Sequence, residues 1–316
     1  LGTGSALPEK VVTNDDLARV MDTSDEWIRT RTGIQKRHIA VNETTTSMAV
    51  EAAKKALEEA KISIDDLDLI IAATVSPDYI FPTLACEVQA AVGAKNATAF
   101  DLGAGCSGFL FALATADAYF KTGRYKNALI IGAETLSKMM DWGDRSTCVL
   151  FGDGAGAAVV SAQGEQLLSM VQGSDGSGGM ALKCDNRPVN NLYHQMGAQQ
   201  YSFTQMEGSA VYKFAVRTVP HAISEALEKA GVPVDDVKLF VLHQANLRII
   251  ESVAKRLRQP MEKFPTNLEE CGNISAASVP ILLDKVRKDG MISKGDKIVM
   301  AGFGAGLTWG ACVIEW

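Results

Sequence analysis

The sequence has no long hydrophobic run, no paired cysteines and few histidines, and each absence excludes a class of protein. No window approaches the ~20 continuous apolar residues of a transmembrane helix, so we expect no membrane partner. The four histidines do not cluster with cysteines or carboxylates, which argues against a metal site. No two cysteines show CxxC spacing, which favours a reducing cytoplasm over a disulfide framework. The six cysteines are Cys86, Cys106, Cys148, Cys184, Cys271 and Cys312.

The composition is that of a folded globular protein. The 316 residues are 47% hydrophobic and 22% charged, and they suffice for one large core or two ordinary domains. The net charge of −6 argues against general nucleic-acid binding, which needs a broad cationic surface. Because Leu1 is not a natural start, we expect further residues upstream.

The chain repeats its own pattern. Residues 64–73 resemble residues 234–243, about 170 residues later, and residues 128–132 match residues 297–301 at nearly the same offset. A helical spacing of apolar residues precedes each copy, although Pro220 limits how regular the second helix is expected to be. Chance resemblance between apolar strands is the alternative, but several segments in the same order favour a duplication.

Short apolar runs that alternate with helical patterns predict β-α-β units with buried strands and right-handed connections. We expect two halves, residues 1–161 and 162–316, to pack as an α/β protein with five layers, α/β/α/β/α. Turns at strand ends of both halves would then converge on one site. Residues 8–46 form a polar insertion in which Thr23 and Glu26 fit a capping box, and the glycine-rich residues 172–207 are expected to form loops.

Cys106 is the first candidate for chemistry. An apolar run leads into it, small residues surround it, and an alanine-rich helical pattern follows. At the positive end of that helix the thiol is expected to rest as a thiolate, the form that attacks carbonyl carbons. The alternative is a small buried hydrophobic residue.

Two segments of the second half add further candidates. His243 directly follows an apolar run, as a catalytic group at a strand end would, although a structural histidine fits equally. Asn273 opens a pattern of small residues, where an asparagine is most often a helix N-cap. Within the repeat, Cys106 aligns with Asn273, so all three residues are expected at related strand ends.

Taken together, the chain resembles the thiolase-like condensing enzymes, and most closely the β-ketoacyl-[acyl carrier protein] synthase III family. The resemblance covers essentially the whole chain. Its motifs lie at residues 2–5, 23–28, 31–34, 152–156, 243–246, 272–278 and 302–310. Papain-like hydrolases also use Cys, His and Asn, but the neighbours that mark their cysteine are absent around Cys106.

The resemblance implies a thiolase-like fold and a decarboxylating condensation that starts fatty-acid synthesis. Cys106 would take the acyl group of a primer, expected to be acetyl-CoA, and malonyl-acyl carrier protein would then lose carbon dioxide and attack it. His243 and Asn273 would donate hydrogen bonds to the enolate oxygen, each worth roughly 3 kcal/mol. No cofactor is implied, since acyl-CoA is a substrate, and a homodimer and an acyl carrier protein are the expected partners.

The resemblance also assigns other residues. Backbone N–H groups of Cys106 and of the Gly304–Ala305 turn would form a second oxyanion hole. Contacts to CoA are expected from Trp27, Arg31, Arg145 and Asn246. The acyl pocket is expected to contain Phe151, Met206, Tyr212 and Phe81, the last reaching the partner subunit.

Charge suggests where the carrier protein docks. Acyl carrier proteins are acidic, as is this chain, so the two need a local basic patch to meet. Arg248, Lys255 and Arg256 offer one on a helical stretch, and Lys213 adds to it; a merely solvated helix face is the alternative.

Three other functions stay open at this stage. A thiolase-fold enzyme with another acyl donor or acceptor would use the same three residues. A catalytically silent scaffold would keep the fold without needing Cys106, His243 and Asn273. A cysteine hydrolase would cleave thioesters without any malonyl substrate.

Overall fold

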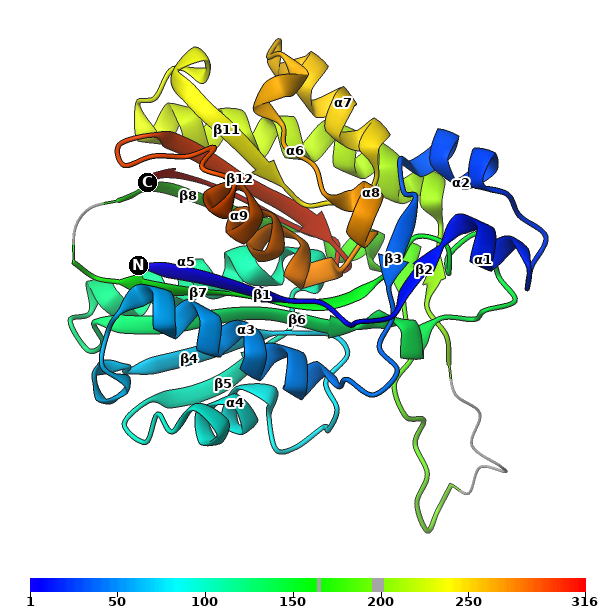
Figure 1. Cartoon of the computed structure of the whole chain (residues 1–316), viewed down its shortest axis with the longest axis horizontal. Helices are drawn as coiled ribbons and strands as arrows, with labels where there is room; N and C mark the ends of the chain where they lie inside the picture. Colours follow the sequence, from blue (N-terminus) through cyan, green and yellow to red (C-terminus); the bar gives the residue numbers. More distant parts are fainter. Residues whose placement is uncertain (164–165, 195–201) are drawn as a thin grey trace.

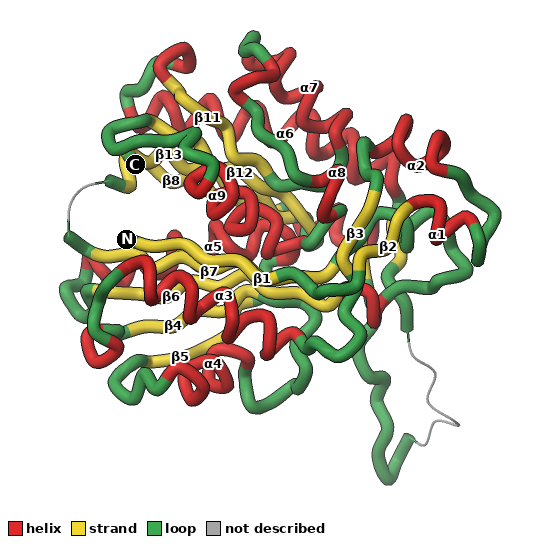
Figure 2. Tube along the Cα trace, in the orientation of Figure 1, coloured by secondary structure: helices red, strands yellow, loops and turns green. Residues whose placement is uncertain are grey.

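Two β-sheets, each covered by helices, form the body of the protein (Figure 1 and Figure 2). The structure is a computed structural model that describes residues 1–163, 166–194 and 202–316. Across the first sheet the strands are β1 (Gly2–Ala6), β7 (Asp153–Ser161), β6 (Asn127–Thr135), β4 (Leu69–Ala73) and β5 (Thr98–Leu102). Across the second they are β11 (Val237–Leu242), β12 (Lys297–Gly304), β13 (Thr308–Glu315) and β8 (Leu167–Ser174).

The main helices form three layers around these sheets. The outer face of the first sheet carries α3 (Thr45–Ala60) and α4 (Leu84–Val92). The layer between the sheets holds α5 (Gly108–Lys121) and α9 (Ser278–Lys288). The outer face of the second sheet carries α6 (Gly208–Ala230) and α7 (Leu247–Leu257). The predicted order of layers, α/β/α/β/α, is confirmed.

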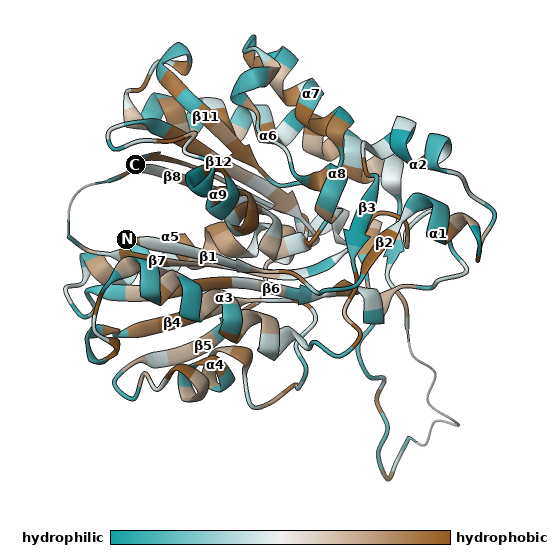
Figure 3. Ribbon diagram, viewed as in Figure 1, coloured by the Kyte–Doolittle hydropathy of each residue, from teal (hydrophilic) through white to brown (hydrophobic). Residues whose placement is uncertain are grey.

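The middle layer explains why the central strands are apolar without interruption. Successive side chains of a strand point to opposite faces. Ile70 of β4 therefore packs toward α3, while its neighbour Ile71 packs toward α5. Phe109 of α5 belongs to the same buried cluster as Ile71, and so does Val241 of the second sheet. Figure 3 shows the resulting pattern, with hydrophobic strands inside and hydrophilic residues on the outer helices.

The duplication is visible in the strand order. In the first sheet β4 is parallel to β6, which is antiparallel to β7, which is antiparallel to β1. In the second sheet β11, β12, β13 and β8 follow in the same order with the same directions. The duplicated architecture is therefore confirmed, and β5 is an addition to the first copy. A division into domains at residues 161 and 162 stays a prediction, because both copies build the middle layer.

The insertion at residues 8–46 folds against the rim of the second half. It contains β2 (Val11–Thr13), α1 (Asn14–Ala18), α2 (Asp25–Thr32) and β3 (Lys36–His38). The predicted capping box is wrong: Ser24, not Thr23, is the N-cap of α2, and its hydroxyl accepts from the Trp27 N–H at 3.1 Å. The sequence pattern placed the cap one residue too early.

Two further regions complete the chain. Helix α6 continues through Pro220 without a break. Packing of its apolar face against the second sheet offsets the hydrogen bond that the proline cannot donate. Residues 175–207 are mostly irregular where described, with only the short η4 (Gly176–Ala181), β9 (Leu182–Lys183) and β10 (Gln205–Met206), and part of them extends away from the body (Figure 1). No helix in the described ranges is both long and apolar enough to cross a bilayer.

Candidate active site

Cys106 lies at the sharp turn between β5 and α5, in the short helix η2 (Gly105–Ser107). Gly304, the last residue of β12, packs directly against it, and a Cβ on Gly304 would overlap the Cys106 backbone nitrogen. Thr308 holds the two turns together, because its Oγ1 donates to the Ala104 carbonyl at 2.9 Å. The backbone of Cys106 therefore sits beside the Gly304–Ala305 turn.

The Cys106 thiol is buried and neutral. Only 9% of the residue is exposed, and burial raises the pKa of the Cys106 thiol to about 12. The nearby Ser275 side chain lowers this pKa, and an ionised Glu134 would raise it further, but both effects are smaller than desolvation. Burial thus opposes the thiolate that the helix N-terminus is expected to favour.

His243 directly follows β11, and its backbone N–H donates to the Ala301 carbonyl at 2.8 Å. Gly302 separates it from Cys106: a Cβ there would lie 3.5 Å from the Cys106 carbonyl oxygen and 3.7 Å from the His243 Cβ. Burial lowers the pKa of His243 to about 3, so its imidazole is neutral. The Phe303 ring packs edge-on against the imidazole, with 5.4 Å between the two ring centroids, and restricts the movement of the imidazole.

Asn273 is held by the backbone on both sides. Its N–H donates to the Leu150 carbonyl at 2.8 Å, and its carbonyl accepts from the Gly152 N–H at 3.0 Å. Its side-chain Oδ1 accepts from the Ser275 N–H at 2.8 Å. These bonds fix the amide, and its Nδ2 has no protein partner within the described residues, so the NH₂ group is the donor it offers.

Shared neighbours bring these three residues to one place. The Ser275 N–H donates to the Asn273 Oδ1, and the Ser275 side chain lies near the Cys106 thiol. Gly302 lies against both Cys106 and His243. A buried thiol, a neutral imidazole and an oriented amide thus meet where turns of both sheets converge. This arrangement suits covalent acyl chemistry with hydrogen-bond donors for a developing oxyanion.

The residues expected to bind CoA cluster around helix α2 of the insertion. The guanidinium groups of Arg31 and Arg145 lie 4.6 and 5.0 Å from the centroid of the Trp27 ring. Arg145 also donates to the backbone carbonyl of Asp22. Asn246 is the N-cap of α7, and its Nδ2 donates to the Arg31 carbonyl at 3.1 Å. Because arginines cover the indole, a base that stacks on it has to displace one of them.

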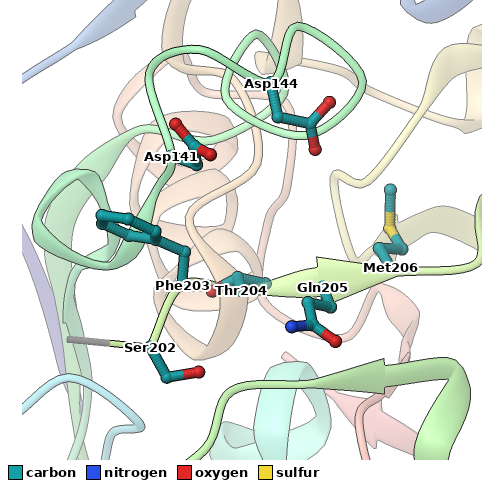
Figure 4. A pocket seen from close by; sticks show the side chains of 7 residues that line it. All are labelled: Asp141, Asp144, Ser202, Phe203, Thr204, Gln205 and Met206. Carbon is teal, nitrogen blue, oxygen red and sulfur yellow. The ribbon is translucent and has the colours of Figure 1, made fainter. Parts of the chain in front are cut away.

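The four residues expected at the acyl pocket lie on different elements. Phe151 is buried and forms a β-bridge with Asn273, next to the catalytic candidates. Phe81, expected to reach the partner subunit, is 83% exposed on the loop before α4, and Tyr212 is exposed on α6. Met206 lines a cavity of about 600 Å³ (Figure 4). The other residues that line it are Asp141, Asp144, Ser202, Phe203, Thr204 and Gln205.

The basic residues proposed for docking are all exposed, on α6 and α7. They are Lys213, Arg248, Lys255 and Arg256. Arg248 is already engaged, since its guanidinium donates to the Thr30 carbonyl of α2 at 2.8 Å. The patch therefore adjoins the helix that carries Trp27.

Three residues near Cys106 have contacts that sequence reasoning missed. Glu134 ends an apolar run, and a carboxylate at that position was the one available signal. Ser275 belongs to the motif at residues 272–278 and Thr308 to the motif at residues 302–310, but neither had an assigned role. The described residues contain no group of three His, Cys, Asp or Glu side chains suited to a metal ion.

Comparisons with known proteins agree over the whole chain. Residues 100–176 match the family 3-Oxoacyl-[acyl-carrier-protein (ACP)] synthase III, and residues 227–316 match its C-terminal family. The chain is 50% identical to beta-ketoacyl-[acyl-carrier-protein] synthase III 1 of Bacillus anthracis and 47% identical to beta-ketoacyl-[acyl-carrier-protein] synthase III of Clostridium acetobutylicum, covering 100% of this chain and 98% of each relative. The crystal structure of 3-oxoacyl-[acyl-carrier-protein] synthase III from Aquifex aeolicus VF5 superposes with a TM-score of 0.93 at 48% identity, over 100% of this chain and 98% of that one.

Proposed function

Because this chain belongs to the 3-oxoacyl-[acyl-carrier-protein] synthase III family, we propose that it condenses an acyl-CoA primer with malonyl-acyl carrier protein, with loss of carbon dioxide. The observation that carries the proposal is that Cys106, His243 and Asn273 lie on buried turns that share Gly302 and Ser275 as neighbours. The product is a 3-ketoacyl-carrier protein, the first intermediate of fatty-acid synthesis.

In the first half-reaction Cys106 takes the acyl group. Its sulfur attacks the thioester carbonyl, the bond to the CoA sulfur breaks, and the proton of the Cys106 thiol ends on CoA. During this attack the thioester carbonyl oxygen becomes negative. The backbone N–H groups of Cys106 and of the Gly304–Ala305 turn stabilise this oxygen. The contact between Gly304 and Cys106 supports this role, because it sets the two turns side by side.

In the second half-reaction the malonyl group loses carbon dioxide. The electron pair moves onto the thioester oxygen, where the ring N–H of His243 and the NH₂ of Asn273 donate hydrogen bonds. The resulting enolate attacks the acyl carbon, and the Cys106 sulfur leaves and is reprotonated. A neutral imidazole suits this task, since it donates without having to accept a proton.

The partners follow from the same assignment. Trp27, Arg31 and Arg145 bind the nucleotide end of CoA by stacking and charge, with Asn246 nearby. Phe81 projects from the surface together with Tyr79 and Ile80, which supports a homodimer that covers these apolar side chains. All six cysteines are free, which supports a cytoplasmic location.

The direct test is a condensation assay across a series of acyl-CoA chain lengths with malonyl-acyl carrier protein held constant. We expect 3-ketoacyl-carrier protein to form in equal amounts with carbon dioxide, with a preference for short primers. Steady release of free acid from acyl-CoA without malonyl-carrier protein would instead identify a hydrolase.

The basic patch predicts how the carrier protein binds. Lys255→Glu combined with Arg256→Glu is expected to raise KM for malonyl-acyl carrier protein about tenfold, since two attractive charges become repulsive. KM for acyl-CoA should stay unchanged in the same steady-state assay. Arg248 is a poorer choice for this test, because its bond to Thr30 ties it to the helix that carries Trp27.

The control for this prediction is Lys54→Glu, a charge reversal on exposed α3 at the opposite outer layer. It should leave both KM values unchanged. If the double variant raised both KM values equally, the patch would not be the docking site.

A further inference from the structure

Glu134, the penultimate residue of β6, is a fully buried carboxyl group that the proposed reaction does not use. Its Oε2 accepts from the Val75 N–H at 3.0 Å, the Thr74 hydroxyl at 3.1 Å and the Ser76 hydroxyl at 2.5 Å. Its Oε1 is equally buried but has no hydrogen-bond partner within the described residues. No cation in those residues forms a salt bridge with it, and burial raises the pKa of Glu134.

Ser275 lies between this carboxyl group and Cys106. Helix η7 (Ser275–Ala277) packs against both β6 and η2, the elements that carry Glu134 and Cys106. The Ser275 side chain lies near both groups, and its proximity lowers the pKa of each. Its φ of +44° lies in the left-handed region, which is strained for a residue with a Cβ. Backbone strain of this kind persists where the surrounding structure holds the residue in place, and it is common at functional sites.

We propose that Glu134 is a positioning residue that carries its proton on Oε1 and donates it to the Ser275 oxygen, so that the Ser275 hydroxyl donates to the Cys106 sulfur. The proposal rests on the nucleophilic role of Cys106 proposed above. It assigns the buried Oε1 a function as a donor, while Oε2 remains the acceptor for three donors from residues 74–76.

The direction of the chain follows from counting protons. A serine hydroxyl has one hydrogen, so it can donate to Glu134 or to Cys106 but not to both. An ionised Glu134 would draw this hydrogen and place a negative charge near the sulfur. A protonated Glu134 turns the hydroxyl toward the sulfur instead. Negative charge on that sulfur, when the proton leaves or when the acyl group departs, is then stabilised by a donor already in place.

The other ionisable groups nearby do not compete for this role. His243 faces Cys106 from the end of β11 and is neutral. Lys138 lies on the far side of the Ser76 backbone, where its Nζ binds the Ser76 carbonyl at 2.8 Å and lies 3.5 Å from the Asp78 carboxylate. Its charge is thus balanced by Asp78 rather than by Glu134.

The test is the rate at which iodoacetamide alkylates Cys106 at pH values from 6 to 10, followed on the Cys106 peptide by mass spectrometry. Ser275→Ala should slow alkylation about tenfold at each pH, the loss expected for one hydrogen bond to a charged sulfur. Glu134→Ala should slow it similarly. Glu134→Gln should stay within about threefold of the parent, because its amide donates to Ser275 and accepts from residues 74–76.

Asp153→Asn is the matched control. Asp153 is another fully buried carboxyl group, on the neighbouring strand β7, and it binds Ser137 and the Ala40 N–H instead. Its replacement should leave the alkylation profile of Cys106 unchanged. The comparison separates an effect on the sulfur from a general loss of packing.

Two outcomes would overturn the proposal. One is a Ser275→Ala profile that superimposes on the parent profile. The other is faster alkylation in Glu134→Gln by tenfold or more, which would show that Glu134 is ionised and repels the thiolate. If Glu134→Ala does not fold, Ser275→Ala and Glu134→Gln still test the proposal. Because alkylation needs no substrate, its result is independent of whether the condensation assay succeeds.

Discussion

Cys106→Ala is expected to lower the rate of 3-ketoacyl-carrier protein formation by at least about a thousandfold, since the acyl group then has no sulfur to which it can transfer. The measurement is single-turnover labelling with radioactive acetyl-CoA, followed by the condensation assay. No label should be retained on the protein. The methyl group of alanine fits the space of the thiol, so the fold should persist.

The control for this variant is Cys86→Ala. Cys86 is half-buried on α4, away from the candidate site. Within the described residues its thiol makes one hydrogen bond, a weak one to the Ala99 carbonyl. It should label and condense like the parent. Full condensation activity in Cys106→Ala would refute the assignment of the nucleophile.

His243→Ala and Asn273→Ala are each expected to slow decarboxylation of malonyl-carrier protein about a hundredfold or more, because each removes one donor to the enolate oxygen. Transfer of the acyl group to Cys106 should change far less. The two steps are separated by measuring carbon dioxide release and self-acylation from labelled acetyl-CoA. His221→Ala, an exposed histidine of α6, should affect neither step.

The pH dependence sharpens this prediction. The pKa of His243 is lowered to about 3, so the imidazole stays neutral as the pH falls from 8 to about 4. A loss of decarboxylation within that window would therefore come from another group. If His243→Ala slowed self-acylation as much as decarboxylation, His243 would be the proton acceptor for Cys106 rather than a hydrogen-bond donor alone.

The pattern of apolar segments predicted the fold well, because each buried strand and helix carries its own periodic signal. The match between residues 64–73 and 234–243 correctly implied that β4 and β11 occupy equivalent places in two sheets. The start of a helix after Cys106 and the end of a strand before His243 were also local signals, and both are confirmed. The proposed chemistry of Cys106 and His243 also depends on what surrounds each side chain in the fold.

Local patterns do not settle what distant contacts decide. Pro220 does not interrupt α6, because burial against the second sheet stabilises the helix on both sides of it. That packing joins segments that are far apart in the sequence.

Residue type and spacing were enough to predict the layers, the duplication and the candidate sulfur, imidazole and amide. The protonation of these groups depends on the fold. Burial between two sheets favours a protonated Cys106 thiol and a neutral His243 ring, and the fold brings Ser275 and Glu134 near the sulfur. Desolvation depends on every chain segment that excludes water from a group, and those segments meet only in the folded protein.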